Sequence, residues 1–170
     1  AVSTGSGESG GTVEIGTGQG ALNLAQGTAI DVQGGDNGDG GKVVLRAPRT
    51  GSGAGTDVAV GSIAGSIGGA GSVVVEAVKV YDNITTLSAT GASAGTLSLD
   101  TVNTDNTSFA SNAGTIASRL GKSGDAVFHV RAGVEVRSAG DLTLDNDWNL
   151  ATRPAGEEPG VLTLKAAGNL

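Results

Sequence analysis

The chain has 170 residues, of which 31 are glycine and none is cysteine, and it carries a net charge of −7 at pH 7. The lack of cysteine excludes disulfides and thiolate metal sites, and an acidic chain repels nucleic-acid phosphates and anionic lipid headgroups, so we expect no nucleic-acid partner. No apolar run reaches the roughly 20 residues that span a bilayer, so we expect no membrane span.

Short runs in which small aliphatic and polar residues alternate predict β-strands along most of the chain. In the first run, Val13 and Ile15 lie on one face and Glu14 lies on the other. In chain order the runs are Gly11–Ile15, Ala21–Leu24, Ala29–Val32, Lys42–Arg46, Asp57–Val60, Ser72–Tyr81, Thr96–Leu99, Val134–Arg137, Asp141–Asp145 and Val161–Lys165. Disordered glycine-rich linkers do not have this alternation, so we expect a folded β protein.

A stretch rich in glycine and aspartate, Gly34–Gly41, separates the third run from the fourth and raises the question of a ligand site. A phosphate-binding loop needs a Ser or Thr and then a helix after its lysine, whereas Val43 and a strand follow Lys42. Calcium loops of repeat-in-toxin proteins space their aspartates in a way that Asp36 and Asp39 resemble but do not match. We therefore interpret the stretch as a corner before a strand, with a Ca²⁺ ion at Asp36 and Asp39 as the open alternative.

Glycines stand just before many of these runs and recur along the chain. Gly11, Gly41 and Gly71 are 30 residues apart, and the recurrence continues less regularly. Its later members are Gly95, Gly140 and Gly160. Several short strands in each period of 20 to 30 residues are typical of a solenoid, in which each coil stacks on the one before it.

A parallel β-helix fits these features best. Its narrow interior suits a core of Val, Leu, Ile and Ala, and glycine, asparagine and aspartate fill the expected corners because they tolerate positive φ. A β-sandwich or an antiparallel barrel also has short alternating strands, but those cores usually hold more aromatic residues than the four present here. The sequence therefore predicts an all-β fold, a parallel β-helix, that forms one domain over residues 1–170.

One segment departs from the strand pattern and predicts a short helix inserted between coils, at about residues 105–121. Asp105 or Thr107 is expected to cap its start, and Gly121 is expected to end it. Its apolar residues recur at helical spacing and are expected to pack on the solenoid. They are Phe109, Ala113, Ile116 and Leu120.

The residues that could support catalysis have more ordinary explanations. His129, the only histidine, alternates with Phe128 and Val130 and is expected to face outward on a strand. β-Helical polysaccharide lyases and hydrolases cluster acidic and basic residues on one sheet face. The residues that could form such a cluster here are Arg131, Glu135, Arg137 and Asp141. Opposite charges on adjacent strands are more often the cross-strand pairs of a solvated face, and we adopt that interpretation.

Two other features carry little functional information. Trp148 stands near a turn and is expected to cover one edge of the hydrophobic interior, with a contact to a sugar as the alternative. Asn83 and Asn106 each begin an Asn-X-Ser/Thr sequon. Such short motifs often arise by chance, so we predict nothing from them.

Several segments resemble the shaft of filamentous-haemagglutinin-like proteins, the large exoproteins of two-partner secretion systems in Gram-negative bacteria. The resemblance is loose before Gly41 and more specific after Ser62. It rests on Ser62–Asp82 (SIAGSIGGAGSVVVEAVKVYD), Ser108–Leu120 (SFASNAGTIASRL), Phe128–Ala151 (FHVRAGVEVRSAGDLTLDNDWNLA) and Pro159–Leu170 (PGVLTLKAAGNL). The Asn-Pro-rich signature of the family's secretion domain is not found, so this piece is expected to be internal to a longer protein.

The resemblance implies a right-handed parallel β-helix and export to the cell surface through an outer-membrane transporter. It implies an adhesive structural shaft that meets a host or bacterial surface receptor or glycan. It implies no enzymatic activity, no cofactor, and no catalytic or metal-binding residues in the shaft. Two alternatives remain open: the stalk of a contact-dependent toxin, and a β-helical polysaccharide-active enzyme.

Overall fold

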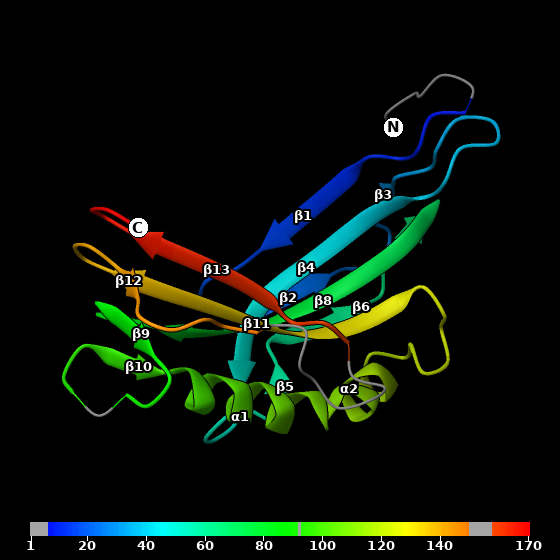
Figure 1. The fold of residues 1–170 in the computed structure, drawn as a ribbon. Coiled ribbons are helices and arrows are strands. Elements are labelled where there is room, and N and C mark those ends of the chain that lie inside the picture. Colours follow the sequence, from blue (N-terminus) through cyan, green and yellow to red (C-terminus); the bar gives the residue numbers. More distant parts are fainter. Residues whose placement is uncertain (1–6, 92, 150–157) are drawn as a thin grey trace.

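The computed structural model describes residues 7–91, 93–149 and 158–170, and the protein is mostly β with two short helices (Figure 1). Its strands are β1 (Thr12–Gly16), β2 (Leu22–Leu24), β3 (Ala29–Asp31), β4 (Gly41–Thr50), β5 (Asp57–Val58), β6 (Val60–Ile63), β7 (Ser66–Gly68), β8 (Ala70–Tyr81), β9 (Thr86–Ser88), β10 (Thr96–Ser98), β11 (Phe128–Ser138), β12 (Thr143–Leu144) and β13 (Val161–Ala166). Each predicted run overlaps one of these strands, whereas β7 and β9 were not predicted.

The main sheet contains strands that are far apart in the chain. Its order is β1-β4-β8-β11-β13, and each neighbouring pair along this path is parallel. Thr12 pairs with Lys42, and Lys42 pairs with Ser72. Paired residues on the first three main-sheet strands, β1, β4 and β8, are therefore 30 positions apart, as the glycine recurrence predicted.

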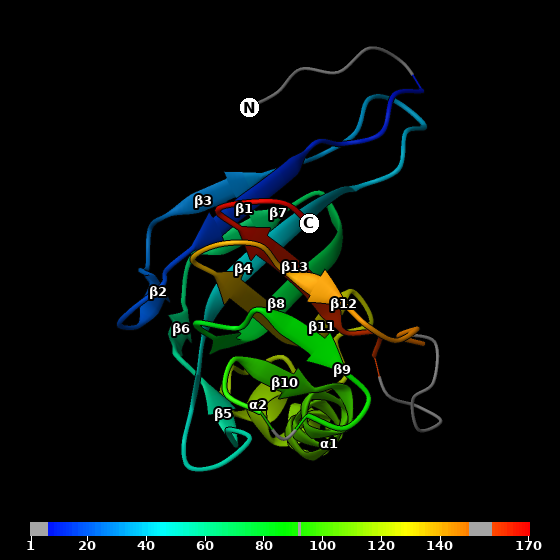
Figure 2. The same cartoon turned by 60° about the vertical axis from the view of Figure 1, so that its left-hand side comes forward.

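Parallel pairing also organises the smaller sheets. β2 pairs with β6, β3 pairs with β7, and β9 lies between β10 and β12. The short β5 is antiparallel to β4. This pairing does not fit a sandwich or a barrel of antiparallel hairpins. Among the described residues the parallel strands curl into an open half-barrel, so the predicted all-β fold is confirmed, whereas the closed coils of the predicted β-helix are not seen (Figure 2).

Alternate residues of the main sheet point into a hydrophobic core. Val43, Leu45, Val73 and Val75 are buried there with side chains from β2 and β6. A second core gathers around Leu87, between the three-stranded sheet and the end of β11. Small aliphatic residues make up most of both cores, in agreement with the prediction from composition.

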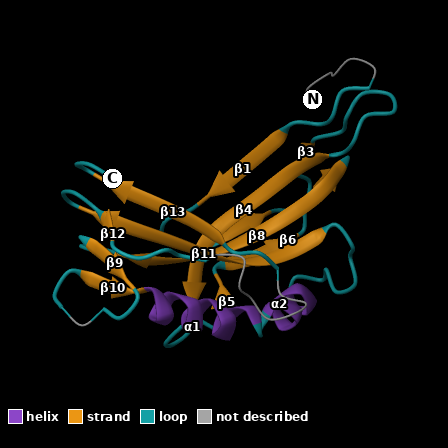
Figure 3. Cartoon of the chain, in the orientation of Figure 1, coloured by secondary structure: helices purple, strands orange, loops and turns teal. Residues whose placement is uncertain are grey.

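The helical insertion differs from the prediction in its boundaries. Instead of one helix over residues 105–121 there are two, α1 (Leu99–Ala110) and α2 (Ala113–Arg119) (Figure 3). Ser98 caps α1, because its side chain accepts a hydrogen bond from the Thr101 backbone N–H. Neither Asp105 nor Thr107 is the cap, since both lie inside α1. Gly121 follows the last turn with a φ of +68°, as a helix-ending glycine does.

The early start of α1 has a physical cause that the sequence pattern concealed. Leu99 and Val102 lie before the predicted start at residue 105, and both are buried in the second core. Residues between Val102 and Phe109 are threonine, asparagine, aspartate and serine, which have low helix propensity. Tertiary burial therefore sets this boundary. The predicted apolar stripe is confirmed, because Phe109, Ile116 and Leu120 are buried in the first core.

Arg49 fastens α1 to the main sheet. Its guanidinium donates to the carbonyl oxygens of Ala77 on β8 and Gly133 on β11, both at 3.0 Å. It also donates to the Asn106 side chain on α1 and lies 4.7 Å from the centre of the Phe109 ring. Burial lowers the pKa of Arg49 to about 10, so the group remains a cation at neutral pH. One side chain thus joins β4, β8, β11 and the helix.

Two further contacts hold the insertion in place. Asp105 on α1 accepts hydrogen bonds from Lys79 and Tyr81, both on β8. Arg119, at the end of α2, donates to the carbonyl oxygens of Val58 at 3.2 Å and Val60 at 2.8 Å. The Arg119 contact places a guanidinium on the backbone of β5 and β6, where it pairs with carbonyl oxygens of both strands.

Gly11, which precedes β1, and Gly41, the first residue of β4, have different surroundings. A Cβ atom at Gly41 would lie 2.3 Å from the Gly11 carbonyl oxygen and 2.5 Å from the Val32 carbonyl oxygen. A Cβ atom at Gly11 would have no atom within 4 Å. Neither residue has positive φ, so at Gly41 close approach of the backbone, rather than an unusual φ, requires glycine.

This difference gives a matched test of the stacking. Gly41→Ala is expected to lower the free energy of unfolding by about 2–4 kcal/mol, because backbone must move to admit the methyl group. Gly11→Ala, at the equivalent position one strand earlier, is expected to change it by less than about 1 kcal/mol. Urea unfolding followed by circular dichroism measures both. Equal effects would mean that the close approach at Gly41 is absent in solution.

Candidate functional site

The main sheet carries a row of charged side chains on its outer face, by which we mean the face opposite α1 and α2. On each strand these residues alternate with the core residues. Arg46 follows Leu45 on β4, Glu76 follows Val75 on β8, and Glu135 follows Val134 on β11. The outer face therefore collects charge from several strands, and it is the candidate site.

Glu135 is the centre of this charged cluster. It is fully buried, with an exposed fraction of 0%, and it contacts three cations. Arg46 Nη2 and Arg137 Nε each lie 2.6 Å from its carboxylate oxygens, and Lys165 Nζ lies at 2.9 Å. Arg46 also donates through Nε to Glu76 at 3.0 Å. The cluster thus connects β4, β8, β11 and β13, and Arg46 reaches across β8 to meet Glu135.

The cations keep Glu135 ionised despite its burial. Burial alone would raise its pKa, but hydrogen bonds from Lys165, Arg46 and Arg137 outweigh that effect and lower the pKa to about 2. Burial opposes the charge of Arg46 as well, yet the bonds to Glu135 and Glu76 raise its pKa overall. At neutral pH Glu135 has no proton to donate and no free lone pair facing solvent. The arrangement is suited to holding strands together rather than to acid–base catalysis.

The four charged residues that were considered as a possible cluster do not all meet. Glu135 and Arg137 are paired, but Arg131 instead lies 3.3 Å from Glu158. Asp141 accepts a hydrogen bond from the Asn169 backbone at 2.7 Å. The interpretation as a solvated face was wrong for Glu135, because the surrounding strands and cation side chains exclude water from it.

Sequence reasoning missed Arg46, Glu76 and Lys165. Arg46 and Glu76 are separated by the same 30 residues as the leading glycines, and the register pairs them directly. The 30-residue period of the glycines could therefore have predicted that Arg46 and Glu76 are neighbours. Lys165 lies beside Arg137 across β11 and β13, where the spacing is shorter and no equally clear glycine signal marks the register.

The other candidates occupy structural positions. His129 lies on β11, and its Nδ1 atom is 2.8 Å from a carboxylate oxygen of Glu158. Trp148 is half-buried against the second core, as predicted, and its Nε1 atom donates to Asn103 on α1 at 3.1 Å. Both side chains thus connect segments that are distant in the sequence.

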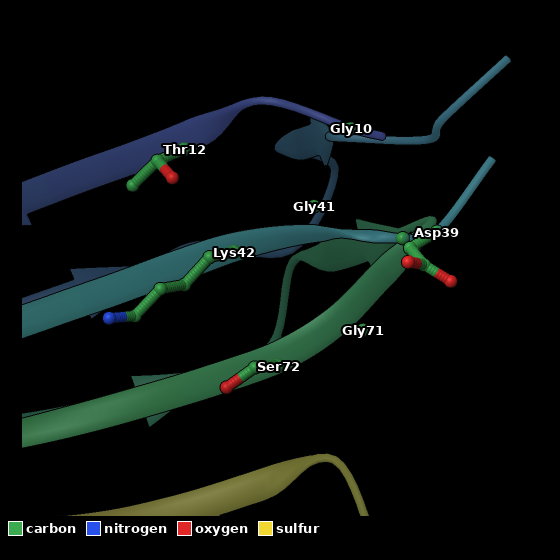
Figure 4. Close-up of a pocket in the computed structure, with 8 residues that line it drawn as sticks. Gly10, Thr12, Asp39, Gly41, Lys42, Gly71 and Ser72 are labelled. Carbon is green, nitrogen blue, oxygen red and sulfur yellow. The ribbon is translucent and has the colours of Figure 1, made fainter. Parts of the chain in front are cut away.

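An open groove lies at the start of the main sheet, on the same outer face. Figure 4 shows Lys42 between Thr12 and Ser72, on three neighbouring strands. The rest of its lining is mostly glycine, which leaves the floor smooth and formed by backbone. The lining residues are Gly10, Thr12, Asp39, Gly40, Gly41, Lys42, Gly71 and Ser72.

The stretch considered for calcium forms the corner next to this groove. The Gly38 N–H donates to the Gly35 carbonyl oxygen at 2.8 Å, which closes a tight turn. The Gly35 N–H in turn donates to Glu8 at 2.8 Å. The predicted corner before a strand is confirmed. Asp36 and Asp39 belong to no set of three or more metal-ligating side chains among the residues that the structure places.

Comparison with protein-family models, curated proteins and solved structures found no match to this chain. Over the described ranges, neither helix has the length and hydrophobicity needed to cross a bilayer.

The cluster makes a prediction about stability and pH. Because the folded-state pKa of Glu135 lies below its usual 4.5, the ionised carboxylate stabilises the fold above pH 4.5, and this contribution is lost as the pH falls toward 2. Glu135→Gln is expected to lower the free energy of unfolding by about 3 kcal/mol at neutral pH. The variant is also expected to lose less of its remaining stability than the parent chain as the pH falls from 4.5 toward 2. Urea unfolding at a series of pH values measures both effects.

Glu14→Gln is the matched control, because Glu14 is exposed on β1. It is expected to leave stability within about 0.5 kcal/mol of the parent chain. If Glu135→Gln and Glu14→Gln gave the same stability and the same pH profile, the buried cluster would not contribute to folding.

Proposed function

We propose that this chain forms successive coils of a right-handed parallel β-helix and serves as part of the structural shaft of a large secreted bacterial surface exoprotein. The observation that carries the proposal is the repeated register Thr12–Lys42–Ser72, in which strands one period apart pair in parallel. β2 with β6 and β3 with β7 repeat the same order on the other sides. A chain that stacks in this way gains length by adding periods.

The charges and the groove of the main sheet are consistent with a structural role rather than a catalytic one. The buried carboxylates of Glu76 and Glu135 are paired with cations within the sheet, and the groove beside Lys42 is open to solvent. The net charge of −7 would keep an elongated rod soluble. The resemblance to filamentous-haemagglutinin-like proteins adds export through an outer-membrane transporter, and adhesion to a host or bacterial surface receptor or glycan.

The two alternatives differ in what they require. A polysaccharide-active enzyme would need acidic residues free to exchange protons with a bound glycan. Glu135, the acidic residue at the centre of the cluster, is buried and bonded to three cations, which disfavours that alternative. The stalk of a contact-dependent toxin would use the same kind of shaft, so it differs from the first proposal only in what the shaft carries.

The proposal is tested on the bacterium that carries the gene. Antibodies against residues 1–170 are expected to label intact cells, and labelling is expected to disappear when the cognate outer-membrane transporter is deleted. Deleting the gene for the exoprotein is expected to reduce attachment to host cells or biofilm formation several-fold. Complementation with the intact gene is the control.

Other results would favour different functions. Loss of growth inhibition toward neighbouring bacteria, with attachment unchanged, would support the toxin stalk. Depolymerisation of a polysaccharide by the purified chain would support the enzyme. A protein confined to the cytosol, with no effect of the transporter deletion, would contradict the proposal as a whole.

A further inference from the structure

The corner between β3 and β4 contains the chain's only Asn-Gly dipeptide, Asn37-Gly38. An asparagine side chain followed by glycine is chemically labile, because glycine has no side chain to shield its backbone nitrogen from the neighbouring amide. Asn37 is exposed and has a φ of +64°, and it occupies the third position of the turn Gly35–Gly38. The reactive pair thus lies at the surface, on a tight turn.

The fold restrains this pair in two ways. The Gly38 nitrogen, which would have to attack, donates its hydrogen to the Gly35 carbonyl oxygen at 2.8 Å. Gly38 also packs closely on the first coil, since a Cβ atom there would lie 1.9 Å from the Glu8 carbonyl oxygen. The reaction therefore requires the corner to open, which releases the Gly38 N–H and lets the chain rotate.

We propose that Asn37 is a site of spontaneous deamidation whose rate is set by opening of this corner. The Gly38 backbone nitrogen bonds to Cγ of Asn37, the Cγ–Nδ2 bond breaks, and ammonia leaves with the proton from the Gly38 nitrogen. Water then opens the cyclic imide at either carbonyl. The products are aspartate, or isoaspartate in which the main chain runs through the former side chain.

The products differ from the parent corner in charge and in length. Each adds a carboxylate between Asp36 and Asp39. Isoaspartate also inserts a methylene group into a main chain that is already packed against Glu8. The bonds from Gly35 to Glu8 and from Gly10 to Asp39, both 2.8 Å, depend on the present path of the corner. Isoaspartate is therefore expected to weaken, irreversibly, the contact between the segment before β1 and the corner before β4.

Asn83 is an internal control for the reaction. It is also exposed with positive φ, at 59°, but Ile84 follows it and shields the backbone nitrogen. Asn37→Gly is the control variant, since glycine adopts positive φ readily and has no amide to lose.

The experiment incubates the full chain, folded and separately in urea, in mildly alkaline buffer for several weeks. Peptide mapping by mass spectrometry follows the replacement of the side-chain NH₂ by OH and separates isoaspartate from aspartate. Conversion at Asn37 is expected in both samples, slower in the folded chain by about tenfold or more, with Asn83 unchanged in the folded chain. The folded, converted fraction is expected to melt at a lower temperature, whereas Asn37→Gly keeps its melting temperature through the same incubation.

Four results would overturn the proposal. Equal rates in the folded and unfolded samples would show that the corner does not gate the reaction. No conversion in the folded chain would show that the corner does not open enough for the reaction to occur in the native protein. Conversion at Asn83 as fast as at Asn37 would show that Asn37 is not the preferred site. An Asn37→Gly chain that loses stability on incubation as the parent does would assign the loosening to another residue.

Discussion

Parallel pairing between strands one period apart is the constraint on which the rest of the structure depends. A parallel neighbour cannot be reached by a hairpin, so the chain must travel away and return before it can pair again. In the first two intervals it does so in 30 residues, through strands that form the smaller β2–β6 and β3–β7 sheets. Because the register is fixed, equivalent residues line up across strands. Small aliphatic residues form the core, and charged residues meet on the outer face.

The charged cluster shows how such a sheet tolerates charge without exposure. Removing a carboxylate from water is costly, and the cost is offset only when strong partners replace the water. Glu135 has three such partners, contributed by β4, by its own strand and by β13. Gly133 leaves room for Glu76 beside them, since a Cβ atom there would lie 2.8 Å from the Glu76 side chain. The helix-bearing face uses Arg49 in a comparable way, to join strands and helix through backbone carbonyl oxygens.

Local patterns were sufficient to predict most of the strands and the presence of an apolar helical stripe, because each depends on residues close in sequence. The glycine spacing added the parallel pairing of the first three main-sheet strands. Local patterns failed where distant packing decides. The start of α1 was missed because Leu99 and Val102 are buried by strands elsewhere in the chain. The burial of Glu135 was missed because an alternating charged residue is usually exposed, and its partner Arg46 lies two strands away and 89 residues earlier in the chain. The third interval, in which Val73 pairs with Phe128, contains both helices, so glycine spacing alone could not give its register.

The long reach of Arg46 has a consequence for the order in which the molecule assembles. Arg46 and Glu76 are 30 residues apart, and Arg46 and Glu135 are 89 apart. Contacts between distant residues cost more chain entropy and form later, so the nearer pair is available before the farther one. In a chain that folds from its N-terminus onward, Arg46 would first pair with Glu76 alone. It would pair with Glu135 only after β11 has joined the sheet. The cluster would then be complete only late in folding, and it would stabilise the sheet after the fourth main-sheet strand, β11, has paired.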